Sequence, residues 1–543
     1  MSSLEINKFF GRKSTLSLLK KRVLDLKEGY RQNIAFLGKR YIGKTTILKK
    51  FFSDLDDKDI IEIFLDLEHK DLDYFYHRFV TSLLYNFSKS NKLPLYEDIS
   101  LLLENTQPLI PQTIKAIKKI QAYLAHNRRI EAYREILSLP QLFAKEADKY
   151  CVLILDEFHA LEDICVEDVF LELGKKIMIQ KRCLYVVTSS HPQIAKRILS
   201  EKLSLLFGDF EKVWIGPFDF KTSQEFVRHQ MKDVKMGLQL MNFVIDFTCG
   251  RPLYLQLLCQ ELVSLSIQHK QNEIFTPLLN RAIENILFDR WGVLGRHFEF
   301  LINSVCYGKG NALYAPLLIA LSDGKQKAKE VIAKTQVRQS VVISKLNRLA
   351  EMEIITKNGY FYYIDDKLFK YWITYVYKPS WKHVDLDFEK QRRQFSKELS
   401  RAIDHFNLNS GKDFPSRIAE LLCCFEDESF SLNGRKYKLP LFEKVVPTRV
   451  RKSSGGYLDV IKAATQAGEW VVFLKMGSIG ENDINSILDV SKNIVKNPKK
   501  RVLVSPSHLD ENARIRALQE RMWIWNEGEL KSLLNFYEKP YIV

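Results

Sequence analysis

Three short segments carry residues whose types and spacing could do phosphate chemistry. The first, residues 33–48, contains the pattern G-x-x-x-x-G-K-T, with Gly38, Gly43, Lys44 and Thr45 at its fixed positions. Glycines let a loop curl so that backbone N–H groups and the N-terminus of the next helix face an anion. The segment therefore predicts a phosphate-binding loop between a strand and a helix.

In a loop of this kind the backbone surrounds the phosphates of a nucleotide. We expect Lys44 to reach the β and γ phosphates of ATP and the Thr45 hydroxyl to ligate Mg²⁺. The expected nucleotide-binding residues of the loop are Gly38, Lys39, Arg40, Tyr41, Ile42, Gly43, Lys44, Thr45 and Thr46.

The second segment is an apolar run, residues 151–155, that ends in Asp156 and Glu157. Such a run is typical of a buried parallel strand, and open α/β sheets bind ligands at the carboxyl ends of their strands. Hydrolysis needs a carboxylate beside the metal and a group that orients water. We expect Asp156 to support Mg²⁺ together with Thr45, and Glu157 to polarise water. As an alternative, the two acids simply begin a surface loop.

The third segment, "CLYVVTSS", ends in Thr188, Ser189 and Ser190. These hydroxyls could sense the γ phosphate or orient water, and Ser189 joins Glu157 and Lys44 as an expected catalytic residue. Serine and threonine also commonly cap strand ends, so a structural role remains open. A further apolar run, residues 60–69, reads as another strand. Strands alternating with helices predict a three-layer, mostly parallel α/β core.

The composition limits the class of protein. The 543 residues suggest several domains, and 46% hydrophobic with 27% charged residues is typical of a globular chain. No apolar run is long enough to span a bilayer, and no secretion signal opens the chain, so we expect a cytoplasmic protein. The eight scattered cysteines are expected to be core thiols. A formal net charge of +16 makes nucleic acid one candidate partner.

Together these motifs resemble the archaeal-type ATPases of the STAND branch of the AAA+ superfamily, which are related in layout to origin-recognition ATPases. The likeness covers most of the chain. It includes "FFGRKSTLSLL", in which Phe10, Gly11 and Arg12 look like the family's box that folds over the nucleotide. It also includes residues 216–227, similar to the entry into the family's helical lid. The resemblance implies that Arg12 contacts the nucleotide.

Two positions depart from the family's pattern. Arg251, between Gly250 and Pro252, stands where the family more often has glycine, and it either caps a helix or touches phosphate. Asp209 stands where the family usually carries a candidate arginine finger. An acid cannot stabilise transition-state charge, so the resemblance implies slow turnover or activation by a different arginine.

Residues 311–366 show the order of helices and strands that is typical of a winged helix-turn-helix. Apolar positions recur at helical spacing, and "KNGYFYYI" predicts a hairpin with Asn358 and Gly359 at its turn. The third helix of such a module can enter a major groove, with contacts expected from Gln336, Arg338, Gln339 and Ser340. In this family the module also serves as a packing element, so DNA contact is one of two alternatives.

The last third begins with a charged helix, residues 388–403, which we interpret as a solvated linker. The following order of elements, with Glu420, Asp459 and Lys475, resembles a PD-(D/E)XK restriction-endonuclease-like domain. Its chemistry needs an acid two residues before the lysine, where Phe473 stands, and Glu469 lies too far along the strand. We interpret the domain as a degenerate nuclease whose basic loops, residues 448–454 and 496–501, either bind nucleic acid or are only solvated.

The sequence therefore predicts an α/β protein with a P-loop NTPase three-layer core (residues 1–217), a helical lid (218–292), a winged-helix domain (293–379) and a restriction-endonuclease-like α/β domain (380–543). The expected function is a switch that binds ATP and Mg²⁺, hydrolyses ATP slowly and acts on DNA or a protein partner, with self-association possible. The alternatives are an ATP-gated, metal-dependent nuclease and a non-hydrolysing DNA-binding regulator.

Overall fold

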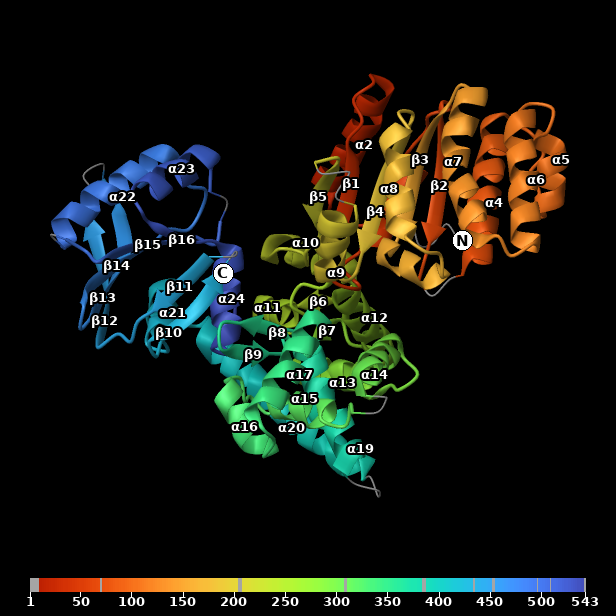
Figure 1. Ribbon diagram of the computed structural model, residues 1–543. Helices are drawn as coiled ribbons and strands as arrows, with labels where there is room; N and C mark the ends of the chain where they lie inside the picture. Colours follow the sequence, from red (N-terminus) through yellow and green to blue (C-terminus); the bar gives the residue numbers. More distant parts are fainter. Residues whose placement is uncertain are drawn as a thin grey trace. The chain divides into compact units, whose positions relative to one another are not determined.

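The structure is a computed structural model that describes residues 9–68, 71–203, 208–306, 310–382, 387–432, 435–451, 455–495, 497–507 and 509–541. The chain divides into two compact units (Figure 1), the first comprising Met1–Phe218 with Arg251–Leu253 and the second Asp219–Gly250 with Tyr254–Val543. The finer division at residues 217, 292 and 379 stays a prediction.

The first unit is built on a parallel sheet with the strand order β2-β3-β4-β1-β5. Its strands are β1 (Asn33–Leu37), β2 (Ile60–Asp66), β3 (Tyr150–Asp156), β4 (Cys183–Ser189) and β5 (Phe210–Trp214). Strand β2 therefore ends three residues before the expected end, and His69 lies outside the described residues. Because all pairs are parallel, the carboxyl ends of the strands meet at one edge of the sheet.

Helices cover both faces of this sheet, as the apolar runs require. On one face α2 (Lys13–Lys27) and α3 (Lys44–Ser53) pack against Ile34 and Phe36 of β1 and against Val152 and Ile154 of β3. The alternate residues of the same strands face a second cluster. The predicted three-layer α/β core is confirmed, and burial of both faces explains why β3 reads as a continuous apolar run.

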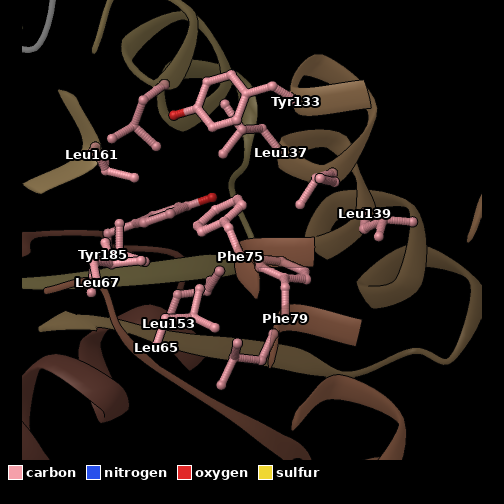
Figure 2. Packing of buried hydrophobic residues seen from close by; sticks show 14 of the residues in the cluster. Leu65, Leu67, Phe75, Phe79, Tyr133, Leu137, Leu139, Leu153, Leu161 and Tyr185 are labelled. Carbon is pink, nitrogen blue, oxygen red and sulfur yellow. The ribbon is translucent and has the colours of Figure 1, made fainter. Parts of the chain in front are cut away.

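The second cluster is the larger one and is rich in aromatic side chains. Phe75 and Phe79 from α4 (Leu72–Ser90) and Tyr133 from α7 (Arg129–Glu146) pack over Leu153 and Tyr185 of the sheet (Figure 2). Among the described residues of this unit, the other α-helices are α5 (Ile99–Thr106), α6 (Pro111–Ala125), α8 (Val169–Ile179) and α9 (Pro192–Arg197).

The second unit begins with helices and two short parallel strands, β6 (Lys235–Met236) and β7 (Glu273–Ile274). Asp219 caps the first helix by accepting a hydrogen bond from the N–H of Thr222. The helices are α10 (Phe220–Gln230), α11 (Leu238–Phe247), α12 (Pro252–Gln268), α13 (Thr276–Phe288), α14 (Val293–Cys306), α15 (Tyr314–Ser322), α16 (Ala328–Thr335), α17 (Gln339–Glu351), α18 (Lys367–Trp372), α19 (Lys378–Lys382) and α20 (Phe388–Ser410).

The hairpin that follows α17 is formed by β8 (Thr356–Asn358) and β9 (Phe361–Tyr363). Because Asn358 pairs with Phe361, the two turn residues are Gly359 and Tyr360. The predicted turn at Asn358 and Gly359 is therefore wrong by one residue. Asn358 is the last strand residue, and its side chain has a different role that is described below.

Helix α20 is not a solvated linker. Its residues Phe395, Leu399, Ile403 and Phe406 are buried, and Phe395 contacts Phe288 of α13 with ring centroids 5.5 Å apart. The charged residues that suggested a linker occupy only the outer face of an amphipathic helix. That interpretation is therefore wrong, and α20 packs on the helices of the expected lid.

The rest of the second unit is a mixed α/β segment whose sheet has the order β12-β13-β14-β15-β16. The pairs β12–β13 and β13–β14 are antiparallel, and the following pairs are parallel. The elements are α21 (Phe414–Leu422), β10 (Glu428–Leu432), β11 (Arg435–Leu439), β12 (Lys444–Arg451), β13 (Tyr457–Thr465), β14 (Gly468–Leu474), α22 (Glu481–Ile494), β15 (Lys500–Val504), α23 (Glu511–Gln519), β16 (Trp523–Trp525) and α24 (Glu527–Phe536).

Two composition-based expectations can be compared with the described residues. Cys151, Cys183 and Cys259 are buried, but Cys165 and Cys423 are exposed, so the expectation of core thiols is wrong for those two. None of the helices in the described ranges combines the length and the apolar character that crossing a membrane would need.

Glu62 of β2 generates a prediction about stability. Burial raises the pKa of its carboxyl to about 7. The pKa of Glu62 in the folded state lies above its value in the unfolded chain. Glu62 therefore does not lower the free energy of unfolding below about pH 4.5, and it lowers this free energy progressively as the pH rises to about 7. We expect Glu62→Gln to stabilise the first unit at pH 8 by about 2–3 kcal/mol and to have little effect at pH 4.

Thermal unfolding of the full chain at both pH values measures this difference. Glu97→Gln, which changes an exposed glutamate of the same unit, is the matched control and should have no effect at either pH. Equal stabilisation by Glu62→Gln at pH 4 and pH 8 would contradict the electrostatic explanation.

Candidate functional site

The phosphate loop, residues 38–43, connects β1 to α3 at the carboxyl edge of the first unit's sheet. The N–H of Gly38 donates to the carbonyl of Ser189 over 3.3 Å, and a Cβ on Gly38 would collide with the backbone carbonyl of Ile215. Gly43 precedes the helix with a φ of 94°, in the left-handed region. Only glycine fits at position 38, where there is no room for a Cβ, and glycine adopts the left-handed conformation at position 43 without strain.

Lys44, the first residue of α3, is almost fully buried. Its Nζ donates to the carbonyl oxygens of Gly38 (2.8 Å) and Lys39 (3.1 Å), and it lies 3.9 Å from Oε1 of Glu157. Only 5% of the side chain is exposed. The ammonium group is therefore held inside the curve of the loop, where an anion that enters the loop would meet it.

Asp156, at the end of β3, is buried and accepts hydrogen bonds from two hydroxyl groups. The Oγ1 of Thr45 donates to Oδ2 over 2.7 Å, and the Oγ1 of Thr188 donates to Oδ1. Burial raises the pKa of Asp156, and these two hydrogen bonds partly oppose the rise. The contacts unite all three sequence segments, because Thr45, Asp156 and Thr188 come one from each.

The donors at this point fit a magnesium ion. Mg²⁺ prefers hard oxygen ligands and is usually held by one or two carboxylates together with substrate phosphates and water. The hydroxyl of Thr45 and the carboxylate of Asp156 supply such oxygens side by side. A cation beside Asp156 would also favour its charged form, which burial disfavours.

Glu157 directly follows Asp156 with its backbone in the left-handed region, at a φ of 55°. Its Oε2 accepts a hydrogen bond of 2.7 Å from the N–H of Ser190 and lies 3.5 Å from Nδ1 of His159. The side chain is 14% exposed. Glu157 is thus positioned by the backbone that follows β4, facing Lys44.

Two histidines beside Glu157 were missed in the sequence analysis. His159 lies two residues after Glu157, and its Nδ1 is 3.0 Å from the hydroxyl of Ser189. Its ring contacts that of His191 edge to face, with centroids 5.0 Å apart. Burial, with the positive charge of Arg40 contributing, lowers the pKa of both histidines to about 4, so both are neutral at pH 7. Their only sequence signal is their adjacency to the acidic pair and the serine pair.

The two serines after Thr188 differ in their surroundings. The hydroxyl of Ser189 contacts His159 and the backbone of His191, while its carbonyl accepts the N–H of Gly38. The hydroxyl of Ser190 is buried and has no hydrogen-bond partner within the part of the chain that the structure describes. Ser190 is therefore the serine whose hydroxyl a substrate could engage, whereas Ser189 is better placed to position His159.

The remaining predicted loop residues separate into core and surface positions. Ile42 is buried in the cluster under α2 and α3, so only its backbone can line the loop. Thr46 is exposed on α3, and Tyr41 has a positive φ of 61°. Arg40 forms an ion pair with Glu68.

Arg12 precedes α2 and lies beside the segment that follows β5. Its guanidinium donates to the carbonyl of Gly216 and lies over the ring of Phe218, 5.0 Å from the ring centroid. Phe10 contacts the same ring, with centroids 6.4 Å apart. In the predicted box, the side chains of Phe10 and Arg12 therefore pack against the ring of Phe218 within the first unit. Arg251 also belongs to that unit and directly precedes α12.

Asp209 lies at the opposite edge of the sheet from the phosphate loop. It precedes Phe210, which pairs with Asn33 at the start of β1, and its carboxylate is 3.9 Å from the guanidinium of Arg31. A side chain at this position could therefore complete only the site of a neighbouring molecule.

The expected DNA-contacting residues lie at the start of α17. Gln336, Arg338, Gln339 and Ser340 are all exposed. In the hairpin that follows α17, Tyr360 at the turn is also exposed, but Asn358 contacts β10. The side-chain amide of Asn358 donates to the carbonyl of Ser431 over 2.8 Å and accepts the N–H of Ser431 over 2.6 Å.

The predicted nuclease-like residues do not assemble a metal site. Phe473 is fully buried in the core of its sheet. Asp459 pairs with Arg449 over 3.2 Å, and Lys475, directly after β14, forms an ion pair with Asp483 of α22. Among the described residues, no group of three or more His, Cys, Asp or Glu side chains could hold a metal ion. The sequence analysis missed Asp483 because it lies on a different element.

Comparison with known proteins gives a fold but no family. No family model matches the chain, and no curated protein matches it. A Walker-type ATPase of Pyrococcus abyssi is similar in structure, with a TM-score of 0.50 and 15% identity, covering 67% of this chain and 96% of the other. That likeness and the loop geometry identify the core as a P-loop NTPase fold.

Two other solved structures are more distant. The ORC2 protein of Aeropyrum pernix, in ADPNP and ADP complexes, has a TM-score of 0.39 and 10% identity, covering 72% of this chain and 94% of the other. The RuvB Holliday junction branch migration motor of Thermotoga maritima has a TM-score of 0.34 and 13% identity, covering 67% and 96%. These weaker likenesses add nothing to the fold assignment.

The two loop glycines should tolerate substitution differently. Gly38→Ala places a Cβ against the backbone carbonyl of Ile215, and we expect it to destabilise the first unit by about 2 kcal/mol or more. Gly43→Ala meets open space and only strains a left-handed φ, so it should cost about 1 kcal/mol. Calorimetric unfolding of the full chain measures both changes. A larger cost for Gly43→Ala would contradict the steric explanation.

Proposed function

We propose that the protein is an ATPase that binds ATP and Mg²⁺ at the phosphate loop and hydrolyses the γ phosphate. One observation carries the proposal: four side chains with the required chemistry converge at one edge of the sheet. Thr45 and Asp156, 111 residues apart in the chain, are joined by a hydrogen bond of 2.7 Å, and Lys44 lies 3.9 Å from Glu157. The fold shared with a Walker-type ATPase is consistent with this function.

Each of these residues has a role in the proposed reaction. Lys44 pairs with the β and γ phosphates, and backbone N–H groups of the loop surround them. Thr45 and Asp156 would hold Mg²⁺, which would neutralise charge on the phosphates. Glu157 orients the attacking water, and the N–H of Ser190 fixes one oxygen of its carboxylate.

The bonds of the reaction balance without a further reactant. The oxygen of water forms a bond to the γ phosphorus, and the bond from that phosphorus to the β–γ bridging oxygen breaks. The electron pair leaves with ADP, and the proton of the water passes to Glu157 and then to solvent. The products are ADP, inorganic phosphate and a proton.

We further propose that turnover is slow and that the protein acts as a nucleotide-dependent switch. Asp209 supports slow turnover, since the position that would supply an arginine to a neighbouring molecule carries an acid. The exposed start of α17 offers a surface that a partner could contact, and the partner would then respond to whether the nucleotide is bound.

Substitutions at Lys44 and Glu157 should fail in different ways. Lys44→Ala removes the buried ammonium and should weaken ATP binding by about 10- to 100-fold. Glu157→Gln keeps the shape but not the basicity, so it should retain ATP binding and lower kcat by about 10²- to 10⁴-fold. ATP titration and single-turnover hydrolysis with Mg²⁺ measure the two steps separately.

Glu167→Gln is the control, because it changes an exposed acid shortly after β3 and should behave as wild type. Turnover by Glu157→Gln at the wild-type rate would exclude the proposed role of Glu157. If the wild-type protein binds ATP but does not hydrolyse it, the protein is a nucleotide-bound scaffold and not an ATPase.

DNA binding through α17 is a second candidate function. The supporting observation is that Arg338, Gln339 and Ser340 are exposed together at the start of this helix. Asn358 of the hairpin is hydrogen-bonded to β10, whereas Tyr360 at the turn of the hairpin is 76% exposed, so both the turn and the start of α17 are available for contact. Nuclease activity is not proposed, because Phe473 occupies the position of the second metal-binding acid.

Salt dependence should identify a DNA contact at Arg338. If its guanidinium neutralises one phosphate, Arg338→Ala should weaken binding to duplex DNA and reduce the slope of log K against log salt by about 1. Arg228→Ala, which changes an exposed arginine of α10, should leave the slope unchanged. A flat salt response of the wild-type protein would favour a protein partner instead.

A further inference from the structure

The phosphate loop carries two cations besides Lys44, namely Lys39 and Arg40. Arg40 stands out because its guanidinium does not extend into solvent. It forms an ion pair with the carboxylate of Glu68, and its side chain is 25% exposed. The loop residue is therefore tied to a second element of the first unit.

Glu68 lies at the same edge of the sheet as the two acids of β3. Strand β2 is the neighbour of β3, and Asp66, the last residue of β2, pairs in register with Asp156. The N–H of Leu67 donates to the carbonyl of Asp156 over 3.0 Å. The side chain of Arg40 therefore reaches from the phosphate loop to the end of β2, beside the strand end that carries Asp156 and Glu157.

The electrostatics of the site agree with this position. Burial is the main cause of the low pKa of His159 and of His191, and the positive charge of Arg40 is among the further causes for both. Such an effect weakens with distance, and His159 is 3.5 Å from the carboxylate of Glu157. Because Glu68 follows β2 and β2 pairs with β3, the guanidinium lies at the same edge of the sheet as Glu157, the group that is proposed to orient water.

We propose that Arg40 is a catalytic arginine that this chain supplies to its own site. In this proposal Arg40 leaves Glu68 and contacts the γ phosphate, where it stabilises the charge that develops as the bond to ADP breaks. A guanidinium forms paired hydrogen bonds with a carboxylate or with a phosphate, so one ion pair can replace the other. The inference rests on the proposed ATP hydrolysis.

The ion pair with Glu68 has a second consequence. Arg40 can act only after its contact with Glu68 is broken, so Glu68 competes with the substrate for the guanidinium. This competition slows turnover, and it adds to the effect of an acid at position 209. Glu68 is then a positioning residue that holds the arginine in an inactive arrangement.

The test compares Arg40→Ala, Arg40→Lys and Glu68→Gln with wild type by steady-state hydrolysis and by ATP titration with Mg²⁺. We expect Arg40→Ala to lower kcat by about 10³-fold while the Kd for ATP changes by less than about threefold. Arg40→Lys should recover only part of the loss, because lysine lacks the planar fork. Glu68→Gln should equal or exceed the wild-type kcat.

Arg22→Ala is the matched control. Arg22 is 22% exposed and pairs with Glu211 and Asp25, so the variant breaks a comparable ion pair near the opposite edge of the sheet. It should leave kcat unchanged. The wild-type specific activity should not depend on protein concentration, since the arginine comes from the same molecule.

Several results would overturn the inference while leaving the ATPase intact. These are a wild-type kcat for Arg40→Ala, an equal loss of kcat in Glu68→Gln, and a specific activity that rises with protein concentration. Failure of the proposed function is recognised separately, because wild type would then hydrolyse no more ATP than Lys44→Ala.

Discussion

The buried carboxylate of Asp156 is the constraint on which the candidate site depends. A charged group with so little exposure must find partners, and it finds them in the hydroxyls of Thr45 and Thr188. One of these hydroxyls belongs to the helix after the phosphate loop and the other to β4. The carboxylate therefore joins the loop to the middle of the sheet, and this contact sets the position of Lys44 against Glu157.

The site also balances charge across a short distance. Lys44 faces Glu157, and Arg40 faces Glu68, so each of these two cations lies against an acid that follows the last residues of a strand. A nucleotide would bring several negative charges into this arrangement and compete with both acids. Under the proposed function, binding and release of ATP would therefore break and re-form the ion pairs of Lys44 with Glu157 and of Arg40 with Glu68.

The second unit uses similar contacts to hold its own elements together. The side-chain amide of Asn358 forms two hydrogen bonds with the backbone of Ser431 in β10, as a neighbouring strand would. A Cβ on Gly359 would collide with the carbonyl of Ser429. In the sheet of β12 to β16, Phe473 fills the core at a position where nuclease chemistry would need a carboxylate. The apolar side chain stabilises that sheet by burial and removes the oxygen that a metal would need.

The sequence by itself determined four of the five core strands (β1 to β4, but not β5), the phosphate loop and the acids at the end of β3, because these depend on local periodicity and short motifs. It also determined that an acid stands at position 209. Only the tertiary structure decided what Arg40 pairs with, because Glu68 lies in the turn after β2, 28 residues further along the chain, and periodicity does not reveal side-chain partners.

The same reason explains why the neutral histidines, the contact of Asn358 with β10 and the ion pair of Lys475 with Asp483 were not anticipated. It also explains why α20 was misread as a linker: its buried face has meaning only against α11 and α13. Motifs are local in the chain, whereas burial and pairing depend on what the fold brings close.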